Sequence, residues 1–313
     1  LPRPEPGPGQ VRVQVSVCGV CRTDLHLTEG DLPPHRPGTV PGHEVVGRVE
    51  RVGPDCDRFT VGQRVGVAWL ASTCGRCRFC RTGRENLCVA PTFTGWDVDG
   101  GYAEELVADE RYVYALPDAF DDDHAAPLLC AGIIGWRALK RAALPPGGRL
   151  GIYGYGASAH LVAQVAVAQG ATVHVMTRSA DAQRLALELG ASSAGGATDA
   201  PPEPLDSAIL FAPVGTLVPV ALAALDRGGT LAVAGIYLSD IPVLRYDEHL
   251  FQEKQLRSVT ANTRADGEEW LAVAARIGLR PHTTLYPMEA ADRALVDLAA
   301  DRVNGAAVIR VRD

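Results

Sequence analysis

Cysteine is too sparse in this chain to build a disulfide scaffold, because only eight cysteines are spread over 313 residues. The sequence also has no basic cluster to offset its net charge of −7, which argues against nucleic acid or an anionic membrane as a partner. No charged segment followed by an apolar one opens the chain, and the most apolar run, residues 161–176, is interrupted by polar residues and a glycine. We therefore expect a cytoplasmic protein.

The composition is that of an ordinary globular protein. A hydrophobic content of 47% over 313 residues is enough for a large core and predicts two domains. There is no internal repeat and no low-complexity tract. The first residue is Leu1, and residues 1–10 have the character of a loop that enters a strand, so we expect an N-terminal piece to precede this numbering.

Half of the cysteines lie in the stretch "CGRCRFCRTGRENLC", residues 74–88. Its spacing allows the four thiolates of Cys74, Cys77, Cys80 and Cys88 to converge on one Zn²⁺. Four protein ligands leave no open position, so this zinc is expected to be structural. The alternatives are surface cysteines that are close by chance, and an iron–sulfur cluster, whose ligand spacings overlap with these.

A second group of reactive side chains follows an N-terminal strand. In "VRVQVSVCGVCRTDLH" alternating valines predict a strand, which then turns and delivers Cys21, Thr23, Asp24 and His26. The pair Cys18 and Cys21 also has the C-x-x-C spacing of a redox motif, which is an alternative interpretation.

The residues that could complete a second metal site are distant in sequence. "GTVPGHEVVGRV" offers His43 and Glu44 beside a strand, and "APLLCAGIIGW" offers Cys130 in an apolar setting. Cys21, His43 and Cys130 together would form a catalytic zinc site with an open position. Singly, a lone histidine is more often a satisfied polar residue, and a lone cysteine in an apolar run is more often core filler.

The middle of the chain contains a dinucleotide-binding fingerprint. An apolar strand ends at Gly154, residues 154–159 form a turn with the pattern G-x-G-x-x-A, and an alanine-rich helix and a strand over 172–176 follow. In this pattern Gly154 makes the turn, Gly156 lets the backbone approach the pyrophosphate, and Ala159 allows close packing. Ala157 and Ser158 complete the expected contact with the cofactor.

Alternation of strands and helices continues beyond this turn. It predicts an α/β, doubly wound parallel-sheet (Rossmann) domain over residues 132–261. The flanks, 1–131 and 262–313, are expected to fold together as the second domain.

Several motifs together resemble those of the zinc-containing medium-chain alcohol dehydrogenases. "CGVCRTDLH", "PGHE", "CGRCRFC" with the later cysteine, "DGGYAEE" and "GYGASAH" occur in that family's order and at its usual intervals, over nearly the whole chain. The resemblance implies a mostly β, GroES-like catalytic domain beside the Rossmann domain and a homo-oligomer, either dimer or tetramer. It also implies two zinc ions per chain: a catalytic zinc on Cys21, His43 and Cys130, and a structural zinc on the four clustered cysteines. Cys18 and Cys56 are left without a role.

The resemblance also implies a mechanism for a small alcohol or aldehyde substrate. Zinc stabilises the alkoxide, which transfers hydride to the nicotinamide, and the proton leaves from Thr23 through the nicotinamide ribose to His26 at the surface. Asp24 is expected to orient His43. Glu44 is expected behind the metal, where it binds transiently during ligand exchange; the alternative is a solvated surface carboxylate.

One departure from the family concerns the cofactor pyrophosphate. In "VNGAAVIRV" Ala306 stands where relatives commonly carry an arginine that touches the pyrophosphate. We expect Arg22, next to Cys21, to supply part of that charge.

The substrate is less constrained by the sequence. Trp69 and Trp96 are expected to line an apolar pocket beside the zinc, with core packing as the alternative for both. Leu32 stands where yeast-type relatives carry a tryptophan, which suggests substrates larger than ethanol, such as aromatic or longer aliphatic alcohols.

Three other functions are weighed against this one. A polyol dehydrogenase usually replaces the third zinc cysteine with a carboxylate, which Cys130 argues against. A zinc-free quinone reductase would lack the cysteine ligands. A nucleotide-binding zinc protein without turnover would not need Thr23 or His26, both of which are present.

The choice between cofactors depends on the end of the second strand, "MTRS". An NAD-specific site would offer a carboxylate about twenty residues beyond the glycines, whereas this chain has Thr177, Arg178 and Ser179. A guanidinium and two hydroxyls suit a 2′-phosphate, so NADP(H) is the expected cofactor. NAD(H) remains the alternative, with Arg178 stacking on the adenine.

Overall fold

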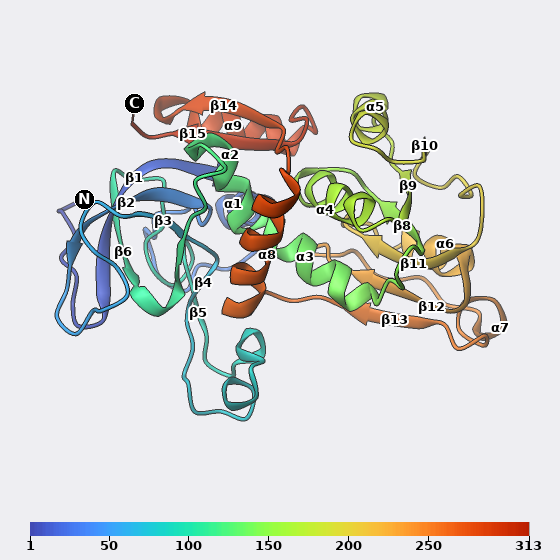
Figure 1. Ribbon diagram of the computed structural model, residues 1–313, viewed down its shortest axis with the longest axis horizontal. Helices are drawn as coiled ribbons and strands as arrows, with labels where there is room; N and C mark the ends of the chain where they lie inside the picture. Colours follow the sequence, from blue (N-terminus) through green and yellow to red (C-terminus); the bar gives the residue numbers. More distant parts are fainter. Residues whose placement is uncertain (313) are drawn as a thin grey trace. The chain divides into compact units, whose positions relative to one another are not determined.

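The structure is a computed structural model that describes residues 1–312 (Figure 1). The chain forms two compact units. The first contains residues 1–133 and 261–313, and the second contains residues 134–260.

A seven-stranded sheet forms the centre of the first unit (Figure 1). Its strands are β1 (Gln10–Val20), β2 (Val45–Val52), β3 (Arg64–Val67), β6 (Glu105–Asp109), β7 (Val113–Ala115), β14 (Thr283–Pro287) and β15 (Ala306–Arg310). Strand β1 is central, because it pairs antiparallel with β2, β6 and β15. The alternating valines Val11, Val13 and Val15 are all fully buried, as expected for a strand with one face in the core.

Helices and a small ribbon complete this unit. The helices are α1 (Arg22–Glu29), α2 (Asp122–Ala125), α8 (Arg264–Ile277) and α9 (Ala291–Ala299), with 3-10 turns η3 (Glu110–Tyr112), η4 (Ala126–Leu129) and η5 (Met288–Ala290). The ribbon of β4 (Leu70–Ser72) and β5 (Thr92–Phe93) carries an extension with two more 3-10 turns, η1 (Cys80–Thr82) and η2 (Glu85–Leu87). Helix α3 (Ala131–Ala142) begins in this unit and continues into the second.

The second unit is a six-stranded parallel sheet with helices. Its strands are β8 (Arg149–Tyr153), β9 (Thr172–Met176), β10 (Ser193–Gly195), β11 (Leu205–Leu210), β12 (Leu225–Val233) and β13 (Gln255–Ser258), and its helices are α4 (Ala157–Ala168), α5 (Ala180–Glu188), α6 (Leu217–Ala224) and α7 (Tyr246–His249). The spatial order β10-β9-β8-β11-β12-β13 is the doubly wound order. From β8 the chain first adds strands toward one edge of the sheet, and from β11 it adds them toward the other edge. The predicted Rossmann fold is therefore confirmed, and the glycine turn follows β8, where ligands bind in such sheets.

Within residues 1–312, none of the helices is both long and apolar enough to cross a bilayer.

Candidate active site

Four potential metal ligands converge in the first unit. One ligand atom from each of Cys21, His43, Glu44 and Cys130 lies within 4.8 Å of the others. Cys21 is the residue that caps the N-terminus of α1, His43 directly precedes Glu44 and strand β2, and Cys130 lies between η4 and α3. The two thiol sulfurs are 4.0 Å apart. The structure thus brings together residues that are more than a hundred positions apart in sequence.

Asp24 organises this cluster from one side. Its carboxylate is fully buried, and it accepts hydrogen bonds from the backbone N–H of Cys21 (2.9 Å), the backbone N–H of Gly42 (3.0 Å) and Nδ1 of His43 (3.0 Å). The bond to Nδ1 leaves Nε2 of His43 as the ring nitrogen that can ligate. This is the orienting role that a carboxylate plays beside a metal-bound histidine.

The surroundings of Nε2 of His43 show whether a metal ion fits between Cys21, His43 and Cys130. This atom is buried and has no hydrogen-bond partner among residues 1–312. A buried polar atom without a partner is costly, and an ion held between two thiols and this nitrogen would supply one. Two cysteines and one histidine are a donor set that Zn²⁺ prefers, with a further position open.

The pKa shifts in the cluster follow from its crowding. The hydrogen bond from the Cys130 thiol lowers the pKa of Cys21 well below its ordinary value, with help from His43 and against burial. Cys21 and burial raise the pKa of Cys130 in turn. Burial is the largest influence on His43 and opposes its protonation, but the charge and hydrogen bond of Asp24, together with Cys21, raise the pKa of the ring well above its ordinary value. Zinc binds the thiolate form, so an acidic Cys21 favours binding.

Glu44 is a buried carboxylate, not a solvated one. It is 2% exposed, and burial, followed by the charge of Cys21, raises its pKa well above the ordinary value. The chain leaves space for it at Gly19, where a Cβ atom would lie 1.9 Å from Oε2 of Glu44. Any side chain at position 19 would therefore displace the carboxylate from the cluster.

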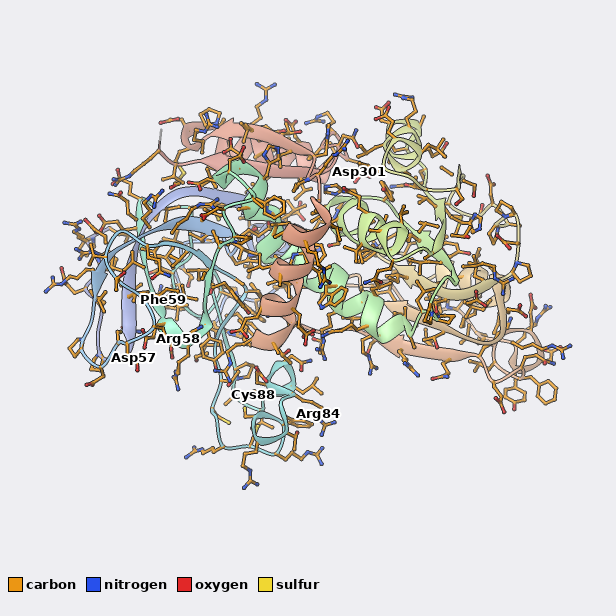
Figure 2. The ribbon with its side chains drawn as sticks, viewed as in Figure 1. Asp57, Arg58, Phe59, Arg84, Cys88 and Asp301 are labelled. Carbon is orange, nitrogen blue, oxygen red and sulfur yellow. The ribbon has the colours of Figure 1, made fainter. Side chains whose placement is uncertain are left out.

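The four clustered cysteines form a separate site in the extension between β4 and β5. Ligand atoms of Cys74, Cys77, Cys80 and Cys88 lie within 4.8 Å of one another, and Sγ of Cys77 and Cys80 are 3.5 Å apart. Backbone N–H groups of Cys80 and Val89 lower the pKa of Cys77 to about 6. Figure 2 labels Cys88 and, near it on the same extension, Arg84. Four sulfurs at these distances fit one tetrahedral zinc.

The residues expected to move protons lie on α1. Sγ of Cys21 is 3.7 Å from the hydroxyl of Thr23, which is buried. His26 was expected at the surface, but it is only 9% exposed, because it sits on the inner face of this short helix. Its Nδ1 lies 2.8 Å from Oδ2 of Asp31, a more exposed carboxylate that was not among the expected site residues. The signal for Asp31 was weak, since an acid five residues past a histidine falls beyond the end of the helix.

The glycine turn of the second unit has the shape that its motif predicts. Gly154 adopts φ +85°, and a Cβ atom there would lie 2.8 Å from the backbone nitrogen of Ala212. Gly156 caps α4, and a Cβ atom on it would meet nothing within 4 Å, so space is open in front of the backbone. Ala157 and Ser158 begin α4, and Ala159 is fully buried.

The three residues that follow β9 differ in their exposure. Thr177 is buried, and its backbone N–H donates to the carbonyl of Gly195 at 2.9 Å. Arg178 is exposed. Ser179 caps α5, and its hydroxyl accepts a hydrogen bond from the backbone N–H of Ala182 at 3.3 Å. No carboxylate occupies these three positions.

Arg22 has an ion-pair partner that the sequence did not reveal. Its Nη2 lies 2.5 Å from Oδ1 of Asp301, which follows α9 with φ +53° and is labelled in Figure 2. Both side chains are partly exposed. The expected contact of Arg22 with pyrophosphate therefore has a competing carboxylate.

Aromatic rings lie beside His43. Trp69 meets the imidazole edge-on, with ring centroids 4.8 Å apart. Phe93 and Trp96 stack with Trp69 at centroid distances of 4.8 and 6.0 Å, and interplanar angles of 18° and 16°. We call Trp69, Phe93 and Trp96 the aromatic cluster. All three are partly buried, with part of each ring left accessible to solvent.

Comparisons with known proteins show what the chain is similar to. Residues 7–118 match the family model of the alcohol dehydrogenase GroES-like domain. The chain is 58% identical to a probable alcohol dehydrogenase, AdhA, of Mycobacterium tuberculosis, over 98% of this chain and 90% of that protein. A cinnamyl alcohol dehydrogenase of Sorghum bicolor has a similar fold, with a TM-score of 0.91 and 29% identity over 99% of this chain and 92% of that one. CAD from Helicobacter pylori, complexed with NADP(H), matches with a TM-score of 0.90 and 26% identity, over 97% and 91% of the chains.

The chain belongs to the zinc-containing medium-chain alcohol dehydrogenases. It is a zinc- and nicotinamide-dependent oxidoreductase that transfers hydride between an alcohol and its carbonyl product, and the predicted family, fold class and activity are confirmed.

Proposed function

We propose that Cys21, His43 and Cys130 hold the catalytic zinc of this alcohol dehydrogenase, and that the four cysteines of the extension hold a second, structural zinc. The observation that carries the first site is the unpartnered, buried Nε2 of His43 in a cluster whose two sulfurs are 4.0 Å apart. When bound there, zinc would supply Lewis acidity that makes a substrate hydroxyl easier to deprotonate. Glu44 stands behind the ligands as a reserve carboxylate for ligand exchange.

Side chains of α1 and the residue Asp31 transfer the proton. The hydroxyl of Thr23, beside Cys21, receives the proton of the substrate alcohol, and His26 holds it on the way to solvent. Asp31, hydrogen-bonded to Nδ1 of His26, is the most exposed of these groups and completes the path. A buried relay of this kind lets a water-poor site exchange protons with solvent.

We propose NADP(H) as the preferred cofactor, bound at the turn of residues 154–159. Arg178 and the hydroxyls of Thr177 and Ser179 take the 2′-phosphate, since no carboxylate there repels it. Arg22 contacts the pyrophosphate after giving up its pair with Asp301.

The aromatic cluster supports a substrate larger than ethanol. A partly exposed set of near-parallel rings next to the expected zinc ligand His43 offers a flat apolar surface on which an aryl group can stack. Similarity to a cinnamyl alcohol dehydrogenase supports an aromatic alcohol or aldehyde. Hydride transfer with a panel of alcohols and both cofactors tests this: turnover only of short aliphatic alcohols would contradict it.

We also propose that the chain acts in the cytoplasm as a homo-oligomer, a dimer or a tetramer. All eight cysteines are free, as zinc thiolates require.

An exposed apolar patch supports the oligomer. Strand β13 is the last of its sheet, and the segment from 236 to 256 exposes seven large hydrophobic side chains: Ile236, Tyr237, Ile241, Val243, Tyr246, Phe251 and Leu256. Such a patch is typical of an interface.

Light scattering tests the oligomer. Val243→Asp should dissociate it, because this side chain is 93% exposed within the patch. Leu187→Asp, at an exposed leucine of α5, should not. A wild-type monomer at micromolar concentration would contradict the proposal.

A further inference from the structure

The segment that follows α1 is held in place by side chains. Residues 31–38, "DLPPHRPG", which we call the strap, contain no helix or strand. Three prolines lack a backbone donor, and Gly38 turns the chain with φ +69°. A stretch with so few backbone hydrogen bonds keeps one position only if other contacts fix it.

Those contacts come from residues sixty positions away. The imidazole of His35 stacks on the indole of Trp96, with centroids 4.0 Å apart and an interplanar angle of 22°. Nδ1 of His35 lies 2.7 Å from Oδ1 of Asp97, and the indole N–H of Trp96 donates to the carbonyl of Pro33 at 3.0 Å. We call His35, Trp96 and Asp97 the clasp.

A second ionic contact follows the clasp. Arg36 pairs with Asp99, and the same carboxylate accepts a hydrogen bond from the backbone N–H of Val40 at 3.0 Å. The strap is thus attached to residues 96–99 at three successive points.

The two ends of the strap meet parts of the active site. At its start, Asp31 is hydrogen-bonded to His26 of the proton path. At the clasp, Trp96 belongs to the aromatic cluster, whose other end meets the zinc ligand His43 through Trp69. One face of Trp96 is covered by His35, so an aryl group that takes this face must displace the imidazole.

We propose that the strap is a specificity-determining cover of the aromatic cluster and that the clasp limits the length of the alcohol or aldehyde that can stack there. The inference rests on the proposed function of the site. A short alcohol at the zinc does not extend to Trp96. A longer conjugated one, in which an aryl ring is separated from the reacting carbon by further atoms, reaches Trp96 and gains its stacking energy only at the expense of the clasp.

The test compares specificity constants, kcat/KM, for 1-propanol, benzyl alcohol and cinnamyl alcohol. His35→Ala should raise the ratio of cinnamyl alcohol to 1-propanol by about three- to tenfold, the range that one aromatic contact supplies. The change should appear in KM, because the indole of Trp96, no longer covered by His35, contributes to substrate binding. Trp96→Ala should lower the ratio by a similar factor, and Trp96→Phe, which keeps a ring but loses the N–H to Pro33, should restore much of it.

The chain offers a matched control for the histidine. His124 has Nδ1 2.7 Å from Oδ1 of Asp121 and is similarly exposed, but it belongs to α2 and not to the strap or the clasp. His124→Ala should leave all three constants within about twofold, as expected for an exposed pair.

The experiment distinguishes failure of this proposal from failure of the proposed function. If the wild-type enzyme oxidises 1-propanol but the ratio is the same in wild type, His35→Ala and Trp96→Ala, the clasp has no role in specificity. If the wild type oxidises none of the three alcohols with either cofactor, the proposed function itself is wrong.

Discussion

Nδ1 of His43 lies 3.0 Å from Oδ1 of Asp24, and neither side chain is exposed to solvent. The carboxylate fixes the tautomer of the ring, because it can only accept a hydrogen bond from Nδ1. Nε2 is left with a lone pair in the cluster formed with Cys21 and Cys130. Affinity for zinc should therefore depend on a residue that does not touch the metal.

Asp24→Asn should weaken zinc binding at this site by about 10- to 100-fold, because the amide is a poorer acceptor for Nδ1–H. The measurement is zinc release to a chelator, followed together with turnover. Asp266→Asn is the control: Asp266 accepts a hydrogen bond from the backbone N–H of Thr263, the N-cap of α8, as Asp24 does from that of Cys21, the N-cap of α1. Equal zinc retention in both variants would contradict the orienting role.

Cys77→Ser should remove the zinc of the extension and lower the melting temperature, since a structural zinc contributes directly to folding. Cys56→Ser, at a thiol outside both groups, should change neither zinc content nor Tm. Calorimetry measures the Tm of both variants, and metal analysis measures their zinc content. A Cys77→Ser protein with wild-type Tm and unchanged zinc content would exclude a structural site there.

Thr23→Val keeps the shape of the side chain and removes the hydroxyl. Turnover should fall by about tenfold or more, which corresponds to about 1.4 kcal/mol of barrier. Thr28→Val, on the same helix, removes a hydroxyl that donates to the carbonyl of Leu25 and should leave turnover unchanged. His26→Gln should slow the enzyme less, because the more exposed Asp31 still offers a base at the end of the path. Full activity of Thr23→Val would remove it from the proton path.

Arg178→Ala should raise the KM for NADP⁺ by about tenfold or more, because a charge-assisted hydrogen bond is lost, while the KM for NAD⁺ changes little. Arg184→Ala, at another exposed arginine in the same unit, serves as the control. Steady-state kinetics with both cofactors give the answer. A wild-type preference for NAD⁺ would show that the residues after β9 were misinterpreted.

Local patterns in the sequence were sufficient for much of the fold. Alternating valines predicted β1, and the glycine turn predicted the sequence β8, α4 and β9 with almost the observed bounds. These signals are local, because the period of a strand and the positive φ of Gly154 depend on neighbouring residues.

The features that were missed depend on tertiary contacts. His26 is buried because of the face of α1 on which it lies, and a helix of eight residues has too little pattern to show that. Asp301 meets Arg22 from 279 positions away, and His35 meets Asp97 from 62 positions away. Spacing along the chain carries no information about such pairs.

The central claim is that Cys21, His43 and Cys130 form a catalytic zinc site distinct from the four-cysteine site. The most direct test is the zinc content of Cys130→Ser, measured together with hydride transfer and Tm, because Cys130 lies far in sequence from every other ligand. We expect two zinc ions per wild-type chain, and one in the variant, with turnover abolished and Tm close to that of the wild type. Two zinc ions and substantial turnover in Cys130→Ser would contradict the assignment.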